Sequence, residues 1–193
     1  EAAAEEINKI FFEVIIAPAY TDGALEILKQ KKNRIILVIK KELDTKMQFR
    51  SILNGALVQE RDLKIETVDD LKQVSEKAVS PQQAADLLFA NKIVKNSKSN
   101  AIVLAKDGML LASGVGQTSR VDALKQAIEK AHSFGFDLHG AFFPFPDCVE
   151  IAHEAGVTAV IHPGGSIRDQ ESVDYCNAND MAMVITGFRH FKH

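Results

Sequence analysis

Apolar residues occur along this chain in two patterns that alternate with each other and are separated by turn residues. Short continuous runs predict buried strands at residues 14–17, 34–39, 101–105, 109–112, 157–161 and 181–185. Helical spacing and capping residues predict helices over residues 1–12, 21–28, 80–94, 119–131, 147–155 and about 168–178. This alternation predicts an α/β fold with a mostly parallel sheet, an antiparallel hairpin at one side, and helices on both faces.

The first residues predict an amphipathic helix, because Ile7, Ile10 and Phe11 fall on one helical face. No initiator methionine, signal sequence or capping residue precedes Glu1. We therefore expect the chain to be a C-terminal piece of a longer protein.

Two later helices carry clear start signals. Thr21 or Asp22 can cap the second helix. Ser80 and Gln83 form a capping box, and Pro81 occupies the first helical position. These helices are expected to begin at those residues.

Residues 101–105 and 109–112 predict a β-hairpin, since Lys106-Asp107-Gly108 between them is a turn signal in which Gly108 supplies the positive φ. The glycine-containing segment 114–119 then leads into the next helix.

Residues 49–59 predict one or two further strands near the edge of a sheet. High charge and weak apolar periodicity across residues 60–79 predict a domain boundary. We divide the chain into residues 1–70 and residues 71–193.

Composition narrows the class of protein. The chain is 46% apolar and 25% charged, which is typical of a globular protein, and its net charge of −3 argues against a nucleic-acid partner. Cys148 and Cys176 lack C-x-x-C spacing, so we expect two buried thiols in a reducing, cytoplasmic setting. No apolar run approaches the roughly 20 residues that a membrane span requires.

A glycine loop follows the predicted strand 157–161. Gly164, Gly165 and Ser166 lie where the carboxyl end of a parallel strand meets the next helix, a position suited to binding a phosphate or carboxylate. The alternative is a tight turn followed by a cap.

Two polar side chains flank other predicted elements. Asn100 directly precedes a strand, and its amide can orient an amide or amine substrate, or can simply complete a turn. Arg120 lies at the start of a helix, where it opposes the helix dipole; it can bind a carboxylate or phosphate, or point into solvent.

Prolines separate a group of aromatic residues: Phe142, Phe143, Pro144, Phe145 and Pro146. Because proline disrupts regular pairing, we expect an irregular loop that presents the rings to a flat heterocycle. The alternative is that the rings belong to the core. Asp147 is either the cap of the next helix or a group that accepts hydrogen bonds from an amino-pyrimidine.

The chain ends in alternating cationic and aromatic residues, from Arg189 to His193. With the glycine loop and the phenylalanines, this ending predicts a site for a planar, phosphorylated ligand. The histidines lack metal-binding spacing, since His153-Glu154 has no second helical histidine and no cysteine pair completes a zinc site. We expect no metal enzyme.

Seven ordered segments resemble the C-terminal part of the bifunctional purine-biosynthesis family AICAR transformylase/IMP cyclohydrolase. They are residues 13–18, 59–62, 98–103, 114–120, 142–147, 163–169 and 189–193. The similarity covers almost the whole chain.

The resemblance implies an activity, a fold and partners. The activity is formyl transfer from formyl-tetrahydrofolate to AICAR, and the parent enzyme also cyclises formyl-AICAR to IMP. The fold is a three-layer, cytidine-deaminase-like sheet without zinc, in which residues 1–70 end a truncated first subdomain and residues 71–193 form the second. The family further suggests a homodimer with active sites at the subunit interface, and a structural monovalent cation such as potassium near residues 95–100.

The resemblance also implies roles for individual residues. Asn100, Phe142 and Arg189 would contact the substrate, with Arg189 on the nucleotide phosphate. The implied folate-binding residues are Arg120, Phe142, Phe145 and Asp147. His193 and the loop of Gly164, Gly165 and Ser166 would lie near the site.

One departure from the family pattern is decisive. The family's catalytic Lys-His dipeptide belongs to a Lys-His-x-Asn-Pro motif, which this chain does not contain. We therefore predict that this chain alone is inactive. Two alternatives remain: a free-standing nucleotide- or folate-binding and dimerisation module, and a zinc deaminase, for which the ligands are missing.

Overall fold

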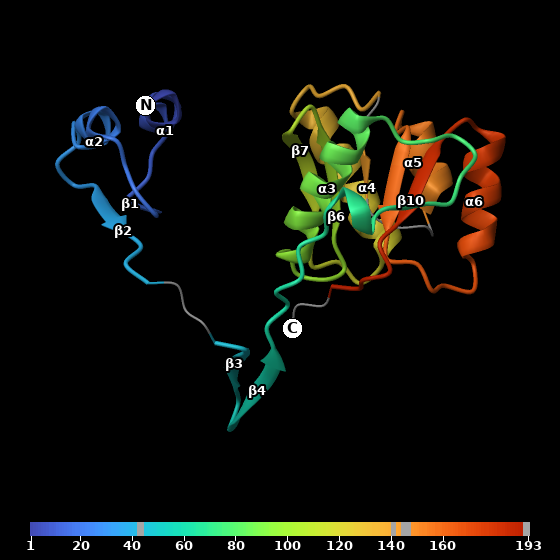
Figure 1. Cartoon of the computed structure of the whole chain (residues 1–193), viewed down its shortest axis with the longest axis horizontal. Coiled ribbons are helices and arrows are strands. Elements are labelled where there is room, and N and C mark those ends of the chain that lie inside the picture. The colour runs from blue at the N-terminus through green and yellow to red at the C-terminus, as the bar shows by residue number, and fades with distance from the viewer. Residues whose placement is uncertain (42–44, 140–141, 144–147, 191–193) are drawn as a thin grey trace. The chain divides into compact units, whose positions relative to one another are not determined.

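The computed structural model describes residues 1–41, 45–139, 142–143 and 148–190. The chain forms two compact units, Glu1–Arg61 and Asp62–His193, which are described separately (Figure 1). The division lies within the expected interval 60–79 but earlier than the boundary placed after residue 70. Residues 62–70 belong with the second unit because Glu66 accepts a hydrogen bond from Asn91 at 3.0 Å.

The first unit contains two helices and two small sheets. Its elements are α1 (Ala2–Lys9), β1 (Val14–Ala17), α2 (Asp22–Leu28), β2 (Ile35–Val38), β3 (Met47–Ile52) and β4 (Gly55–Glu60). Strands β1 and β2 pair in parallel, whereas β3 and β4 form an antiparallel hairpin. The expectation of strands within 49–59 is confirmed. Thr21, rather than Asp22, caps α2, since its hydroxyl accepts a hydrogen bond from the N–H of Ala24 at 3.2 Å.

The prediction that Ile7, Ile10 and Phe11 share one face of the first helix is wrong in part. Helix α1 ends at Lys9, so Ile10 and Phe11 lie beyond it and are exposed. Ala4 and Ile7 pack instead against Leu28 of α2. The two apolar residues therefore continued the helical spacing without continuing the helix.

The second unit is built around one six-stranded sheet. Its elements are η1 (Val68–Asp70), β5 (Lys72–Gln73), α3 (Pro81–Lys95), β6 (Ile102–Lys106), β7 (Met109–Gly114), α4 (Arg120–Ser133), β8 (Phe142–Phe143), α5 (Val149–Glu154), β9 (Ala159–His162), α6 (Asp169–Ala178) and β10 (Ala182–Ile185). The strand order is β5-β10-β9-β8-β6-β7. Strands β8, β9 and β10 are parallel, while β6 and β7 form an antiparallel hairpin at one edge. The mixed α/β architecture is as predicted, but the expectation of a mostly parallel sheet is wrong: among the described residues, β5–β10 and β6–β8 are antiparallel in addition to the hairpin, and only β8–β9 and β9–β10 are parallel.

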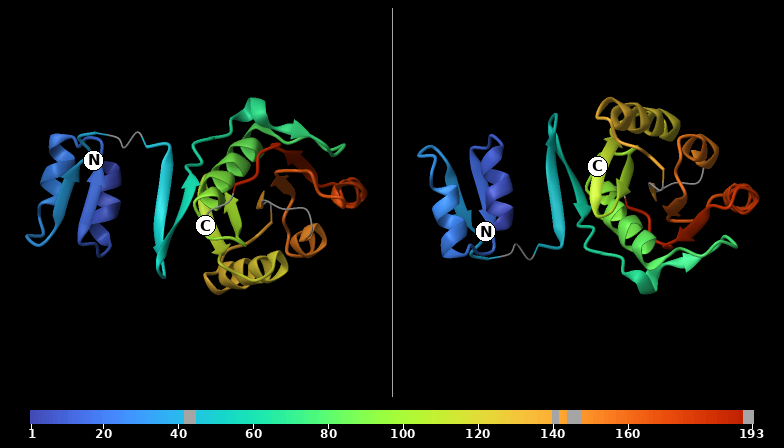
Figure 2. Two further views of the ribbon diagram at one scale, coloured as in Figure 1. Left: turned by 90° about the horizontal axis from the view of Figure 1, so that it is seen from below. Right: turned by 90° about the horizontal axis from the view of Figure 1, so that it is seen from above.

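Helices pack on both faces of this sheet. Leu104 on β6 and Val160 on β9 pack in the cluster formed with α4, α5 and α6. Val103 on β6 packs against α3 through Ala90, and Ile161 on β9 packs against α3 through Leu87. Because side chains alternate along a strand, neighbouring residues face opposite helix layers. Figure 2 shows α3 in green on one side of the sheet and α4 in yellow on the other.

Local signals for the starts of helices are confirmed. The Ser80 hydroxyl accepts from the N–H of Gln83 at 3.2 Å, and the Gln83 side chain accepts from the N–H of Ser80 at 2.8 Å. Ser119 caps α4 by accepting from the N–H of Asp122 at 3.0 Å. Each bond satisfies an N–H that the helix leaves without an internal partner.

The predicted hairpin turn is present, and a helix stabilises it. Asp107 and Gly108 both have positive φ, 53° and 70°, as a tight hairpin turn requires. The carboxylate of Asp86 on α3, which is 1% exposed, accepts from the backbone N–H groups of both residues. The turn and the helix are therefore joined through one buried side chain.

The prediction of an irregular loop around the prolines is wrong for Phe142 and Phe143. Their backbone forms β8, which pairs with Ala105 of β6 and with Ala159 and Val160 of β9. Phe145 and Asp147 lie outside the described residues. The following helix begins at Val149, with Cys148 at its capping position.

Candidate functional site

The residues of the candidate site lie at one edge of the six-stranded sheet. The parallel strands β9 and β10 end at this edge. Strand β6 begins there because it is antiparallel to β8, and β7 ends there because it is antiparallel to β6. The carboxyl edge of parallel strands is where α/β sheets bind ligands, since loops and helix starts converge on it.

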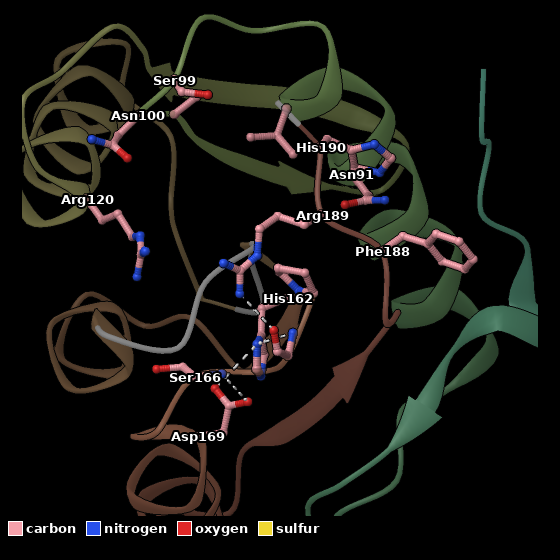
Figure 3. Close-up of a pocket in the computed structure, with 14 residues that line it drawn as sticks. Asn91, Ser99, Asn100, Arg120, His162, Ser166, Asp169, Phe188, Arg189 and His190 are labelled. Atoms are coloured by element: carbon pink, nitrogen blue, oxygen red, sulfur yellow. Dashed lines mark hydrogen bonds and ion pairs between the residues drawn. The ribbon is translucent and has the colours of Figure 1, made fainter. Parts of the chain in front are cut away.

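A cavity of about 100 Å³ lies at this edge (Figure 3). The residues that line it come from α3, from the segment before β6, from the start of α4, and from the segments after β9 and β10. They are Asn91, Val94, Ser99, Asn100, Ala101, Arg120, His162, Pro163, Gly164, Ser166, Asp169, Phe188, Arg189 and His190.

Arg189 follows β10 and reaches across the cavity to the loop after β9. Its Nη2 donates to the carbonyl oxygen of Gly164 at 3.1 Å. Figure 3 shows the guanidinium groups of Arg189 and Arg120 extending into the same space from different segments. Two guanidinium groups directed into one cavity favour an anionic ligand.

The glycine loop has a backbone that side chains would strain. Gly164 and Gly165 have φ of +77° and +83°, in the left-handed region. A Cβ on Gly165 would lie 3.8 Å from Nη2 of Arg189. The loop therefore brings backbone close to the arginine, and its glycines are required by conformation.

His162 and Asp169 hold this loop in place. Nδ1 of the buried His162 accepts a hydrogen bond from the N–H of Gly164 at 3.0 Å. Asp169, at the start of α6, accepts from the N–H of Ser166 at 3.1 Å. The N–H of Gly164 can donate only to an unprotonated Nδ1, which leaves Nε2 as the nitrogen that carries the proton of a neutral ring. The loop forms a braced turn, as the simpler interpretation predicted, and Gly164 and Ser166 also line the cavity. Binding of a phosphate or carboxylate by this loop stays a prediction.

Asn100 connects two loops at the edge of the cavity. Its Nδ2 donates to the carbonyl oxygens of Gln117 and Thr118, each at 3.2 Å. Backbone hydrogen bonds in both directions also join Asn100 to Gln117. The amide therefore completes a turn, as the simpler interpretation predicted, while the residue lines the cavity.

Close packing sets the position of Arg120. Gly114, at the end of β7, lies so near to α4 that an added Cβ would be 1.9 Å from the carbonyl oxygen of Ala123. Only glycine permits this approach. Helix α4 starts one residue after its cap Ser119, which places Arg120 at the edge of the cavity.

A group of charged residues lies beside Arg189. Nε2 of His190 is 2.8 Å from Oε1 of Glu66, and Nδ1 of His190 contacts Oδ2 of Asp62. Lys95 of α3 lies 3.3 Å from the other oxygen of Asp62. Burial raises the pKa of Asp62, but the hydrogen bond and charge of His190 and the charge of Lys95 outweigh it, so this pKa lies below its usual value of 3.8.

The structure brings together most of the described residues that the sequence marked as a site. Asn100, Arg120, Gly164, Ser166 and Arg189 all line the cavity, and Gly165 adjoins Arg189. Phe145, Asp147 and His193 lie outside the described residues, as does the side chain of Phe142. Their proposed roles stay predictions.

Four polar residues of the site or its surroundings were missed by the sequence analysis: His162, Asp169, Asn91 and Glu66. His162 carried a weak signal, because a histidine ends an otherwise apolar strand directly before the glycine loop. Glu66 is 124 residues from its partner His190 and 25 from Asn91. No local pattern predicts such contacts.

Among the residues that the structure describes, no cluster of three or more histidine, cysteine or acidic side chains is suited to hold a metal ion. Across the same residues, no helix combines the length and apolar character needed to cross a membrane.

The described residues define a mixed α/β protein with a cavity, lined by Arg120 and Arg189, at the carboxyl edge of its parallel strands. The chain belongs to the AICARFT/IMPCHase bienzyme family, whose model matches residues 1–130.

Curated relatives support this membership. The chain is 70% identical to the "Bifunctional purine biosynthesis protein PurH" of Bacteroides thetaiotaomicron, covering 100% of this chain and 39% of that protein. The proteins of the same name from Acetivibrio thermocellus and Chlorobium chlorochromatii are 50% and 51% identical, and the chain spans 39% and 38% of their lengths. The chain thus spans less than half of these relatives.

Solved structures are less similar. The dCMP deaminase of cyanophage S-TIM5, in apo form, matches with a TM-score of 0.38 and 17% identity over 54% of this chain and 98% of that chain. A diaminohydroxyphosphoribosylaminopyrimidine deaminase/5-amino-6-(5-phosphoribosylamino)uracil reductase from Thermotoga maritima matches with a TM-score of 0.35 and 22% identity over 51% of this chain and 33% of that chain. Neither score is high enough to carry an argument.

Proposed function

We propose that this chain forms part of an AICAR transformylase of purine biosynthesis. The complete protein would transfer a formyl group from formyl-tetrahydrofolate to AICAR and then cyclise formyl-AICAR to IMP. The observation that carries the proposal is that Arg120 and Arg189 line one cavity with Asn100 and the glycine loop. Family membership supplies the reaction, and the cavity supplies a site of matching charge.

In this proposal the two arginines divide the ligands between them. Arg189 binds the phosphate of AICAR beside the glycine loop, where a planar guanidinium can donate two parallel hydrogen bonds. Asn100 contacts the substrate, and Arg120 contacts the folate. The remaining proposed folate contacts are Phe142, Phe145 and Asp147, with His193 near the site.

The wider features of the family belong to the same proposal. The second unit is the zinc-free, cytidine-deaminase-like subdomain, with helix layers covering both faces of its sheet. The first unit is the end of the preceding subdomain. The complete protein is a cytoplasmic homodimer with active sites at the subunit interface, and potassium binds near residues 95–100.

This chain supplies binding and orientation rather than proton transfer. The Lys-His-x-Asn-Pro motif, whose histidine serves proton transfer from the weakly nucleophilic amine in the family, is absent from its sequence. Anchoring the phosphate would restrict the position of the amine relative to the formyl donor, which lowers the entropic barrier to reaction.

Calorimetric titration of AICAR into the chain tests the proposal. Arg189→Ala should weaken binding by about tenfold or more, because it removes a charge-assisted contact. Arg168→Ala is a matched control, since Arg168 pairs with Glu171 on the surface and does not line the cavity. Equal affinity of wild type and Arg189→Ala would remove Arg189 from the site.

The second candidate is a free-standing nucleotide- or folate-binding and dimerisation module without catalysis. The missing Lys-His-x-Asn-Pro motif favours it for this polypeptide taken alone. The upstream coding sequence distinguishes the two: the motif shortly before Glu1 supports the enzyme, and a start codon beside Glu1 supports the module.

A further inference from the structure

His190 lies between two carboxylates and is nearly buried. Its side chain is 9% exposed, that of Glu66 is 2% exposed, and that of Asp62 is 30% exposed. Nδ1 faces Asp62, and Nε2 faces Glu66 at 2.8 Å. The second oxygen of Glu66 accepts from Nδ2 of Asn91 at 3.0 Å.

Both ring nitrogens of His190 face carboxylate oxygens, so two hydrogen bonds need two protons on the ring, one more than a neutral imidazole carries. A neutral imidazole has a single N–H and can donate to only one carboxylate. Its other nitrogen would then place a lone pair against a carboxylate oxygen. An imidazolium has two N–H groups and donates to both carboxylates.

The same segment orients Arg189 through its neighbours. Phe188 precedes Arg189, and the ammonium group of Lys64 lies 4.6 Å from the centre of the Phe188 ring. His190 follows Arg189 and contacts Asp62 and Glu66. Both neighbours of Arg189 are therefore held by residues 62–66, while Arg189 itself extends to Gly164 across the cavity (Figure 3).

We infer that His190 is a positioning residue that, as an imidazolium held between Asp62 and Glu66, keeps Arg189 directed into the anion-binding cavity. The inference deepens the proposed function and rests on it for the identity of the ligand. When the ring loses one proton, a nitrogen lone pair of His190 faces a carboxylate oxygen. One of the contacts with Asp62 and Glu66 is then lost, and the segment that carries Arg189 becomes less firmly held. Binding of an anion by Arg189 should therefore weaken as the pH rises.

Other charged groups surround the cluster. Lys95 approaches Asp62 from α3, and Lys64 pairs with Asp70 at 2.7 Å within the segment that contains Glu66. Arg189 directly precedes His190 in the sequence. Burial raises the pKa of Asp62, but His190 and Lys95 hold it below its usual value, so the extra proton is assigned to the imidazole rather than to Asp62.

Substitution of Glu66 separates positioning from simple structural support. In Glu66→Gln, the amide oxygen can accept from Asn91 while its NH₂ group donates to Nε2 of a neutral His190, whose Nδ1–H donates to Asp62. All contacts are then kept without the extra proton. Asp69→Asn is the matched control, because Asp69 is exposed in the same segment and the substitution removes the same charge.

The first measurement is the affinity for AICAR by calorimetry between about pH 7 and pH 9.5, a range above the phosphate's second pKa near 6. For wild type and Asp69→Asn, the dissociation constant should rise about tenfold across this range, as expected for loss of one charge-assisted contact. For Glu66→Gln it should stay constant within about twofold, well below that loss. Identical pH profiles for wild type and Glu66→Gln would overturn the inference.

The second measurement needs no ligand. In protein labelled with ¹⁵N-histidine, the His190 signals are assigned by their loss in His190→Gln. Wild type should show both ring nitrogens protonated at pH 7, and Glu66→Gln should show one. A neutral ring in wild type would overturn the inference even if AICAR binds, whereas a doubly protonated ring without AICAR binding would contradict only the proposed function.

Discussion

The buried carboxylate of Asp86 accepts a hydrogen bond from the backbone N–H of Gly108, 2.6 Å away. It thereby joins α3 to the turn of the β6–β7 hairpin, at the end of β6 away from the cavity. Because the N–H of Asp107 donates to the same side chain at 3.1 Å, the carboxylate satisfies two turn donors.

Removing this carboxylate should destabilise the protein. Asp86→Ala leaves two turn N–H groups without their acceptor, so the free energy of unfolding should fall by about 2–4 kcal/mol. Urea unfolding followed by circular dichroism measures the change. Asp174→Ala, at an exposed position on α6, serves as the control and should change stability by no more than about 0.5 kcal/mol. An equal effect of both substitutions would contradict the role of Asp86.

A methyl group at Gly114 should disrupt the packing that places Arg120. An added Cβ would lie 1.9 Å from the carbonyl oxygen of Ala123, so α4 would have to move away from β7. Gly114→Ala should lower stability by about 3 kcal/mol or more and should weaken ligand binding. Gly55→Ala is the matched control, because the nearest atom to its Cβ is 3.8 Å away. Wild-type stability of Gly114→Ala would show that α4 can adjust.

Asp62 should contribute to the acid dependence of stability. Its pKa in the folded protein lies below 3.8, because His190 and Lys95 outweigh the effect of burial. The stabilisation is therefore present above the unfolded pKa and is lost as the pH falls below 3.8 towards the folded value. Unfolding free energies measured across this acid range should fall less steeply for Asp62→Asn than for wild type. Asp69→Asn should retain the wild-type slope, and a wild-type slope in Asp62→Asn would contradict the prediction.

The two cysteines should resist thiol reagents in the folded protein. Both side chains are buried, as the sequence predicted, and burial raises the pKa of Cys176 to about 11. Since the thiolate is the reactive form, labelling with a thiol-specific reagent at about pH 8 should be slow until denaturant is added. Rapid labelling of the native protein would show that the core around α6 opens readily.

The chain alone should bind AICAR without formylating it. Formyl transfer can be followed by the release of tetrahydrofolate, with the complete relative from Bacteroides thetaiotaomicron as the positive control. Because the chain lacks Lys-His-x-Asn-Pro, we expect no turnover above background. Detectable formyl transfer by the chain would show that the motif is dispensable.

Local patterns in the sequence determined much of the secondary structure. The Ser80 capping box, the Asp107-Gly108 turn and the strands before and after the last helix depend on residues only a few positions apart. Propensity and periodicity report such interactions directly. The same patterns gave wrong predictions at Ile10, where the helical spacing continues beyond the end of the helix, and at Phe142, where the nearby prolines predicted a loop but the backbone forms a short strand.

Tertiary structure alone decided how the site is assembled. The sequence marked Asn100, Arg120 and Arg189 by their chemistry, but their meeting at one cavity follows from the strand directions, which put the start of β6 and the ends of β9 and β10 at the same edge of the sheet. The contact of Glu66 with His190 spans 124 residues and has no local signal. Hydrogen bonds between distant segments form only once the sheet fixes their positions, so the pairing that orients Arg189 is a property of the fold.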